Sequence, residues 1–295
     1  MIQPPPSPAQ PTDLPQAAEM LCELAVALGD SGTPAHRLED ALVRCSRNLG
    51  VRASFFAMPT AVFAAFDAPP HPAPPGSLEI SAHTRLIRVQ SGETDLARLT
   101  DLDGLLDGVS SGRFSVAEAR RRIAGVRSRP PLYSRGLTLA CFGVVGACAA
   151  RLFGAGWHEQ SAASLAGLGV GATVIYGGRR LGPVADFVAG LLAAAVAVAA
   201  AGWFRPCSAR TVMLAGLIVL IPGLTLTLAV TELATRNLVA GTARLMGAMT
   251  TFVGIGFGAA IGQQAVGRAL GVEAVAGTAS PSLPDWTLPL SLLLV

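Results

Sequence analysis

The pattern of apolar and polar positions changes near residue 136. Before that point charged residues recur every few positions, whereas after it single charges separate long uncharged runs. A helix needs about 20 apolar residues to cross a bilayer, and five of these runs approach or exceed that length. The five predicted spans are 136–150, 160–178, 187–204, 211–231 and 245–267. We therefore predict a mainly α-helical protein, in which a five-span transmembrane bundle at 131–270 follows a small domain.

The region before the spans, residues 14–130, combines two periodicities. Apolar residues recur at helical spacing in four segments, and polar and apolar residues alternate between the second and third of these, as in half-buried strands. The predicted helices are 14–28, 34–48, 95–109 and 115–128, and the predicted strands lie in 53–66 and 77–90. Thr33 is the expected N-cap of the second helix, before Pro34, and Ser115 with Glu118 forms a capping box. These elements predict a small α+β domain.

The two ends of the chain have a different character. Residues 1–13 are rich in proline and lack the apolar core of a secretory signal, so we expect a disordered tail. Residues 271–295 are expected to be a linker followed by the start of an incomplete sixth span. The last apolar run stops after about 10 residues, which is too short to cross a bilayer.

The fourth predicted span contains a break in its middle. Residues 211–231 carry no charge, but Pro222 and Gly223 interrupt them. Proline removes a backbone donor and clashes with the preceding turn, and glycine loosens the chain beside it. Broken helices at membrane depth occur where protein or a cavity satisfies the freed backbone groups, and many transporters build substrate sites from them. This break is the strongest functional indication in the sequence.

Composition agrees with an integral membrane protein, since the chain is 51% hydrophobic and only 14% charged. All 22 basic residues are arginine, and the cluster from Arg113 to Arg135 precedes the first span. Arginine bias toward the cytoplasm places the N-terminus and the α+β domain inside the cell. The cluster is better explained by this topology and by anionic lipid in the bilayer than by nucleic acid, which we do not expect as a partner.

The sequence lacks the common motifs of an enzyme or a metal protein. It has no phosphate loop, no G-x-S-x-G and no H-E-x-x-H, and its four histidines are scattered. The five cysteines form no C-x-x-C pair, which argues against a zinc site or a disulfide framework. We therefore predict no catalytic residues, no metal and no cofactor.

Polar residues in or near the spans are the candidate substrate and ion pathway, because ionisable groups there are costly and often functional. Glu232 follows the broken span, with Arg236 four residues later as a potential partner and Arg244 in the next span. A cation and a carboxylate there could meet the two charges of an amino acid, and a carboxylate could exchange protons. An equally good explanation is that these residues lie at the membrane interface and only determine where the spans end. The pathway candidates are Asp186, Pro222, Gly223, Thr225, Thr227, Thr231, Glu232 and Arg244.

Glycines at four-residue spacing indicate close helix packing. Gly254, Gly258 and Gly262 form one such row, and Gly167 and Gly171 another. Rows of small residues let transmembrane helices approach closely, so both predict helix contacts.

Three stretches resemble the bacterial and fungal threonine/serine exporter family. One of them, DLDGLLDGVSSGRFSVAEARRRI, looks like the family's paired helices before the first span. The α+β domain contains the stretch LALGDSGTPAHRLEDALVRCSRNLG, which is similar to a pattern of the family. The residues that match this pattern are Gly32, Thr33, Arg37, Glu39, Leu49 and Gly50. In the membrane part, LIPGLTLTLAVTELATRNLVAGTARL resembles a Leu-x-Pro-Gly segment followed by an acidic residue and Gly-x-x-Arg. The residues that match this membrane pattern are Leu220, Pro222, Gly223, Glu232, Gly241 and Arg244.

The resemblance implies a multi-pass secondary transporter of the bacterial inner membrane. It would export threonine and serine by proton antiport, with small amino acids and protons as its ligands. It also implies a second five-span half, either fused or on a separate chain, and assembly into an oligomer. Two alternatives stay open: a split-type exporter of dicarboxylates such as succinate, and a membrane-anchored protein whose cytoplasmic domain senses a ligand.

Overall fold

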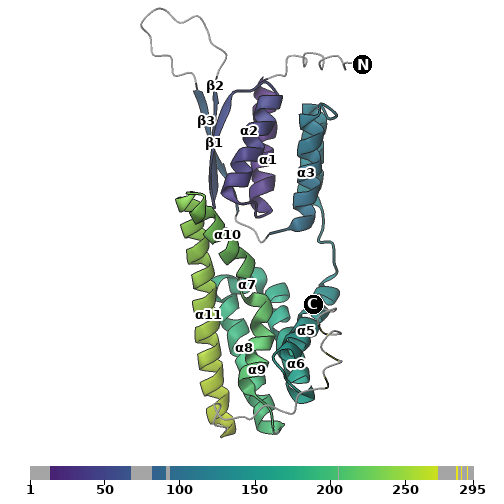
Figure 1. Cartoon of the computed structure of the whole chain (residues 1–295), viewed down its shortest axis with the longest axis vertical. Coiled ribbons are helices and arrows are strands. Elements are labelled where there is room, and N and C mark those ends of the chain that lie inside the picture. The colour runs from purple at the N-terminus through teal and green to yellow at the C-terminus, as the bar shows by residue number, and fades with distance from the viewer. Residues whose placement is uncertain are drawn as a thin grey trace, which may run out of the picture. The chain divides into compact units, whose positions relative to one another are not determined.

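The computed structural model describes residues 14–67, 82–90, 94–204 and 206–271, together with Pro284, Thr287 and Ser291. The predicted tail and nearly all of 271–295 lie outside these residues. The chain divides into two compact units (Figure 1). The N-terminal unit contains Met1–Pro130 and Leu226–Leu245, and the membrane unit contains Pro131–Thr225 and Met246–Val295.

The N-terminal unit packs four helices with a three-stranded antiparallel sheet of order β1-β2-β3. The helices are α1 (Leu14–Asp30), α2 (Ala35–Asn48), α3 (Leu96–Ser110) and α4 (Val116–Ser128). The strands are β1 (Ala53–Met58), β2 (Ala61–Asp67) and β3 (Ala82–Arg88). Phe63 of β2 lies opposite Phe56 of β1 and Leu86 of β3, which fixes the register of the sheet.

Turn and cap residues explain where several of these helices begin. Gly32 has φ +80°, and this left-handed conformation allows the sharp turn between α1 and α2. The predicted cap at Ser115 is confirmed, because its side chain accepts a hydrogen bond from the Glu118 backbone N–H. The predicted cap at Thr33 is wrong. Pro34 occupies the N-cap position of α2 instead, with an extended backbone.

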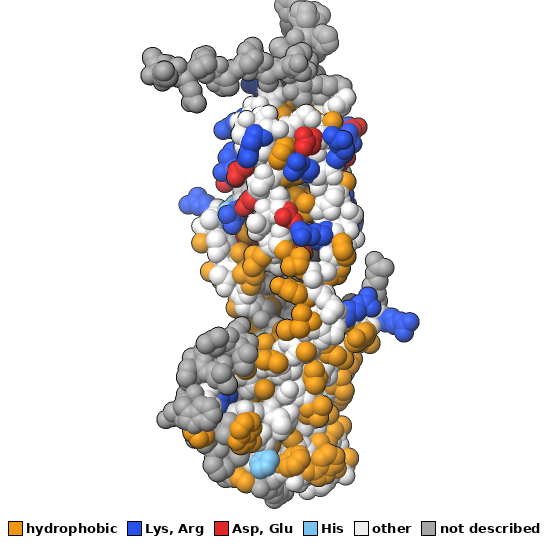
Figure 2. All heavy atoms as spheres, turned by 90° about the vertical axis from the view of Figure 1, so that its right-hand side faces the viewer, with side chains coloured by type: hydrophobic (Ala, Val, Ile, Leu, Met, Phe, Trp, Pro, Cys, Tyr) orange, Lys and Arg blue, Asp and Glu red, His pale blue; other side chains and the backbone are white. Residues whose placement is uncertain are grey.

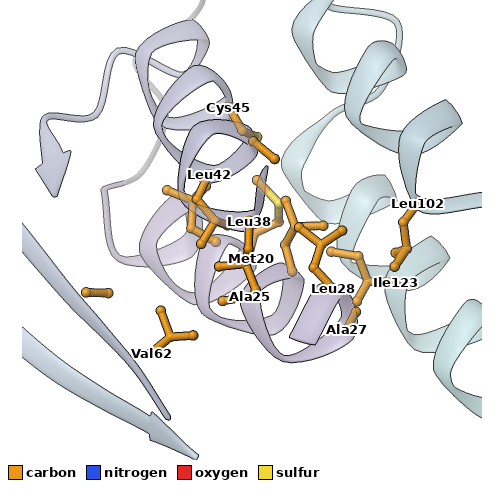
Figure 3. Packing of buried hydrophobic residues seen from close by; sticks show 14 of the residues in the cluster. Met20, Ala25, Ala27, Leu28, Leu38, Leu42, Cys45, Val62, Leu102 and Ile123 are labelled. Atoms are coloured by element: carbon orange, nitrogen blue, oxygen red, sulfur yellow. The ribbon is translucent and has the colours of Figure 1, made fainter. Parts of the chain in front are cut away.

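One continuous core holds the N-terminal unit together (Figure 3). Met20 and Leu24 from α1 and Leu42 from α2 are completely buried, as Leu102 of α3 is. Val62 of the sheet and Ile123 of α4 belong to the same core and are 1% exposed. Each of these side chains contributes roughly 1.5–3 kcal/mol through removal from water. The helical periodicity seen in the sequence therefore corresponds to one shared apolar layer.

The membrane unit is helical, with long apolar helices separated by short helical segments. Its elements are α5 (Arg135–Leu152), α6 (Trp157–Ala172), a π-helix (Thr173–Gly177), α7 (Gly178–Leu181), a 3₁₀ turn (Gly182–Val184), α8 (Ala185–Trp203), α9 (Ala209–Leu217), a 3₁₀ turn (Ile218–Leu220), the start of α10 (Gly223–Ala234) and most of α11 (Leu238–Leu270). On the face shown in Figure 2, apolar side chains cover most of the described part of this unit, whereas arginine and acidic side chains gather over the N-terminal unit.

Among the described residues, α5, α8 and α11 are long and apolar enough to cross a membrane, and the bent pair α9–α10 makes a fourth if counted as one span. The predicted number of five is not confirmed. The second predicted span, 160–178, is divided between α6, the π-helix and α7, and α6 itself has only 16 residues. A π-helical turn is wider than an α-helical one, and it interrupts the regular hydrogen bonding of this segment.

Glycines allow α8 and α11 to pack with their backbones in contact. A Cβ atom on Gly258 would overlap the carbonyl oxygen of Phe187, and one on Gly262 would overlap that of Leu191. On α8, a Cβ on Gly190 would overlap the carbonyl oxygen of Ile255. The predicted glycine row on α11 is therefore a helix contact, because only residues without a side chain permit this approach.

Gly258→Leu should separate α8 from α11 and strongly lower the yield of folded protein, because the obstacle is backbone that cannot rotate away. The matched control is Gly256→Leu on the same helix, where an added Cβ meets no atom within 4 Å. Size-exclusion profiles of both variants in detergent provide the measurement. A monodisperse Gly258→Leu protein at normal yield would show that the two helices can separate without loss of the fold.

Candidate functional site: a buried ion pair beyond the broken span

The helix break occurs at the predicted place. The 3₁₀ turn Ile218–Leu220 is followed by Ile221 in an extended conformation, and α10 begins at Gly223. The two halves of the span are bent by 56°. Pro222 lies between them and has no backbone N–H to continue a helix. The break thus sets the direction in which α10 leaves, and α10 carries Glu232 near its end.

Glu232 and Arg244 form a buried ion pair within the N-terminal unit. The Arg244 Nε lies 3.1 Å from Oε1 and 3.0 Å from Oε2 of Glu232. The Glu232 side chain is 0% exposed and that of Arg244 is 16% exposed. A buried carboxylate is strongly destabilising unless it is paired and hydrogen-bonded, so this pairing is what makes the burial of Glu232 tolerable. Both residues were pathway candidates, and the structure brings them into contact.

The same pair holds the loop between α1 and α2. Glu232 Oε1 accepts a hydrogen bond of 2.9 Å from the Ala35 backbone N–H, and Arg244 Nη2 donates one of 3.1 Å to the Thr33 carbonyl oxygen. Ala35 is the first residue of α2, whose N–H has no partner within the helix. We call Glu232, Arg244 and the Thr33–Ala35 backbone the buried clasp. It joins segments that are about 200 residues apart, as the separation of 197 between Ala35 and Glu232 shows.

The space beside the clasp is too small for an amino acid. A cavity of about 20 Å³ is lined by Gly32, Thr33 and Arg244 together with Ala240 and the Met58–Pro59 turn. This volume suits about one water molecule, whereas ligand sites usually measure about 300–1,000 Å³. The Thr33 hydroxyl oxygen is buried there without a hydrogen-bond partner among the described residues. The clasp is therefore closed in this structure.

The remaining predicted pathway residues do not join the clasp. Arg236 follows α10 with φ 64°, and the carboxylate of Glu232 is paired with Arg244 rather than with the predicted neighbour. Thr227 and Thr231 are exposed on α10, and the Thr231 hydroxyl donates to the Thr227 carbonyl oxygen. Thr225 belongs to the membrane unit and is half-buried.

Asp186 also lies in the membrane unit, in the first turn of α8, where a negative charge is favourable. It is half-buried, and its Cβ would lie 3.2 Å from a Cβ placed on Gly254 of α11. Asp186 thus faces the glycine row of α11.

Two carboxylates outside the predicted pathway, one buried and one half-buried, also hold elements together. Glu159 is completely buried in the first turn of α6, and its Oε1 accepts a hydrogen bond of 3.1 Å from the Ser208 backbone N–H just before α9. In the N-terminal unit, Glu39 accepts a hydrogen bond of 2.7 Å from the Ala57 backbone N–H, which ties α2 to β1. Burial raises the pKa of Glu39 above its ordinary value. A charge beside a long apolar run was the only hint of Glu159.

The apolar helices define an integral membrane protein. A family model described as "Putative threonine/serine exporter" matches residues 19–266, which is most of the chain. The chain belongs to that family. It is a family of membrane transporters, which is consistent with the expectation that the chain is not an enzyme. The described residues contain no group of three or more His, Cys, Asp or Glu that could hold a metal ion.

Several curated fungal proteins are similar to the chain over most of its length. An uncharacterized protein of Schizosaccharomyces pombe is 26% identical over 85% of this chain and 33% of its own length. Pheromone-regulated membrane protein 10 of Pichia sorbitophila is 23% identical over 85% of this chain and 25% of its own length. The chain thus spans a third or less of the length of these relatives. No solved structure matches it.

Proposed function

We propose that this chain is part of a secondary transporter that exports threonine and serine in exchange for protons. The observation that carries the proposal is the buried Glu232–Arg244 pair, located at the end of a span that is broken at Pro222. Ionisable groups in or beside membrane spans are costly, and in transporters they mark substrate and ion pathways. Membership of the exporter family supports the choice of substrate.

The clasp provides a chemical basis for proton coupling. The Glu232 carboxylate accepts hydrogen bonds from Arg244 and from the Ala35 N–H. A proton on Glu232 would remove the charge that holds Arg244. Arg244 would then be free to bind the carboxylate of an amino acid, for which its planar fork is well suited. Loading of substrate and release of the proton would thus be mutually dependent.

Orientation and assembly are further parts of this proposal. The arginine cluster before α5 supports a cytoplasmic N-terminal unit. The relatives are at least three times the length of the region they share with this chain, which is in keeping with a second half supplied in the full transporter. A site that contains Glu232 and Arg244 would then be one part of a larger pathway.

The test is a flux assay with the full chain in proteoliposomes loaded with labelled threonine. We expect threonine to leave the vesicles faster when an opposing proton gradient is imposed, and serine to compete. Succinate serves as the comparison, because a dicarboxylate exporter would prefer it. Absence of threonine flux from vesicles with correctly inserted protein, together with absence of export from cells that make it, would contradict the proposal.

A further inference from the structure

A second, open pocket lies between α2 and α3 of the N-terminal unit. Its volume is about 360 Å³, which falls within the range usual for small-molecule sites. Arg44 and Arg47 of α2 and Asp107 of α3 line it, and Cys45 and Leu106 provide apolar surface. Asn48 and Ser110 also line it, so most of its lining is polar or charged and suits a small polar metabolite better than an apolar ligand.

The two arginines of this pocket have no protein partner. Arg44 and Arg47 are three residues apart on α2, so they lie on the same side of the helix. Within the described part of the chain, no carboxylate oxygen lies within 4.0 Å of either guanidinium, whereas seven other arginines of this unit form ion pairs. The paired arginines are Arg52, Arg98, Arg120, Arg122, Arg127, Arg129 and Arg244. Two adjacent unpaired guanidinium groups form a natural receptor for a carboxylate.

The opposite wall supplies the complementary charge. Asp107 lines the pocket from α3 and forms no ion pair with a described residue. Burial raises the pKa of the Cys45 thiol to about 11, so this part of the wall is neutral at physiological pH. A ligand with a carboxylate at one end and an ammonium group at the other would satisfy both walls. That is the chemistry of a free α-amino acid.

Helix chemistry alone does not account for these arginines. Arg47 in the last turn of α2 is favoured by the helix dipole, but Arg44 lies about a turn earlier. The positive charges of the two side chains also repel each other. A larger pocket of about 540 Å³ between α3 and α4 has its arginines engaged, Arg122 with Glu118 and Phe114 and Arg129 with Asp101. The pocket between α2 and α3 therefore differs from this larger pocket in that its arginines form no ion pair with a described residue.

We propose that this pocket is a regulatory site for an α-amino acid, with Arg44 and Arg47 binding the carboxylate and Asp107 the ammonium group. The choice of a transported amino acid as the ligand rests on the proposed function, whereas the site itself does not. The pocket involves the C-terminal half of α2, and the buried clasp holds the first residue of the same helix through Ala35. A 14-residue helix is about 21 Å long and moves as one element.

This arrangement connects the pocket with the clasp. Binding that draws α2 toward α3 changes the position of Ala35 relative to Glu232, and a change at the clasp alters the pocket in return. Such coupling is reciprocal by thermodynamic necessity. High internal amino acid would thus adjust the export rate through α2.

The test uses hydrogen–deuterium exchange of the full chain in detergent, which reports protection segment by segment. Excess L-threonine or L-serine should slow exchange in α2 and α3. The variant Arg44→Ala/Arg47→Ala should lose this protection, with apparent affinity reduced at least about tenfold, because both charge-assisted donors to the carboxylate are removed. Arg37→Ala/Arg121→Ala removes the same charge from exposed arginines outside the pocket and should behave like the parent protein.

Two comparisons make the outcome decisive. Asp107→Asn should weaken the effect of threonine and leave that of succinate unchanged or stronger, because only threonine carries an ammonium group. Protection of α2 and α3 that survives Arg44→Ala/Arg47→Ala, or that occurs only in the membrane unit, would overturn the proposal. Protection that persists in a protein without threonine flux would support the site while contradicting the proposed transport. Normal threonine flux without protection of α2 and α3 would contradict the site while supporting the proposed transport.

Discussion

Glu232→Gln should abolish most threonine efflux and destabilise the N-terminal unit. The amide can still accept the hydrogen bond from the Ala35 N–H, but it cannot neutralise Arg244, which is left as a largely buried charge. Removing one partner of a buried ion pair costs about 3–5 kcal/mol. The measurements are efflux from proteoliposomes and thermal unfolding in detergent. Glu118→Gln is the matched control, since its exposed pair with Arg122 contributes at most about 1 kcal/mol.

A double variant separates a structural role of the clasp from a functional one. Glu232→Leu with Arg244→Met replaces both charges by apolar groups of similar size, and such replacements are often neutral or stabilising. Stability should therefore return toward that of the parent protein, while efflux stays lost. Recovery of both properties together would show that the pair only holds α10 and α11 against the loop, and would remove it from the transport mechanism.

Pro222→Ala should reduce threonine efflux at least about tenfold without lowering thermal stability. Alanine can complete the helical hydrogen bond that proline prevents, and it is about 3 kcal/mol more favourable inside a helix. The 56° bend would then decrease, and α10 would leave in a different direction. Efflux and unfolding temperature are measured as above.

Leu224→Ala is the control for this variant. It shortens an exposed side chain beside the break and leaves the backbone unchanged. If Pro222→Ala exports threonine at the parent rate, the break is a tolerated irregularity rather than part of the pathway.

Much of this molecule follows from local sequence. The four helices and the strands of the N-terminal unit occur within a few residues of their predicted ends, because apolar periodicity reports which face is buried. The break at Pro222 was also evident, since proline acts on its own helix. The prediction of Thr33 as the N-cap was wrong because Pro34 can precede a helix as well as begin one. The predicted number of five spans is not confirmed, because the π-helical turn at 173–177 divides the second predicted span and cannot be recognised from hydropathy.

The sequence by itself determined the apolar helices, the α+β elements, the helix break and the glycine row on α11. Each of these depends on neighbours within one or two turns. Only the tertiary structure decided that Glu232 pairs with Arg244 rather than with Arg236, and that this pair holds the Thr33–Ala35 loop. It also brought unpaired arginines and Asp107 around one pocket. These contacts join residues far apart in the chain, and a linear pattern contains no information about which distant helix ends meet.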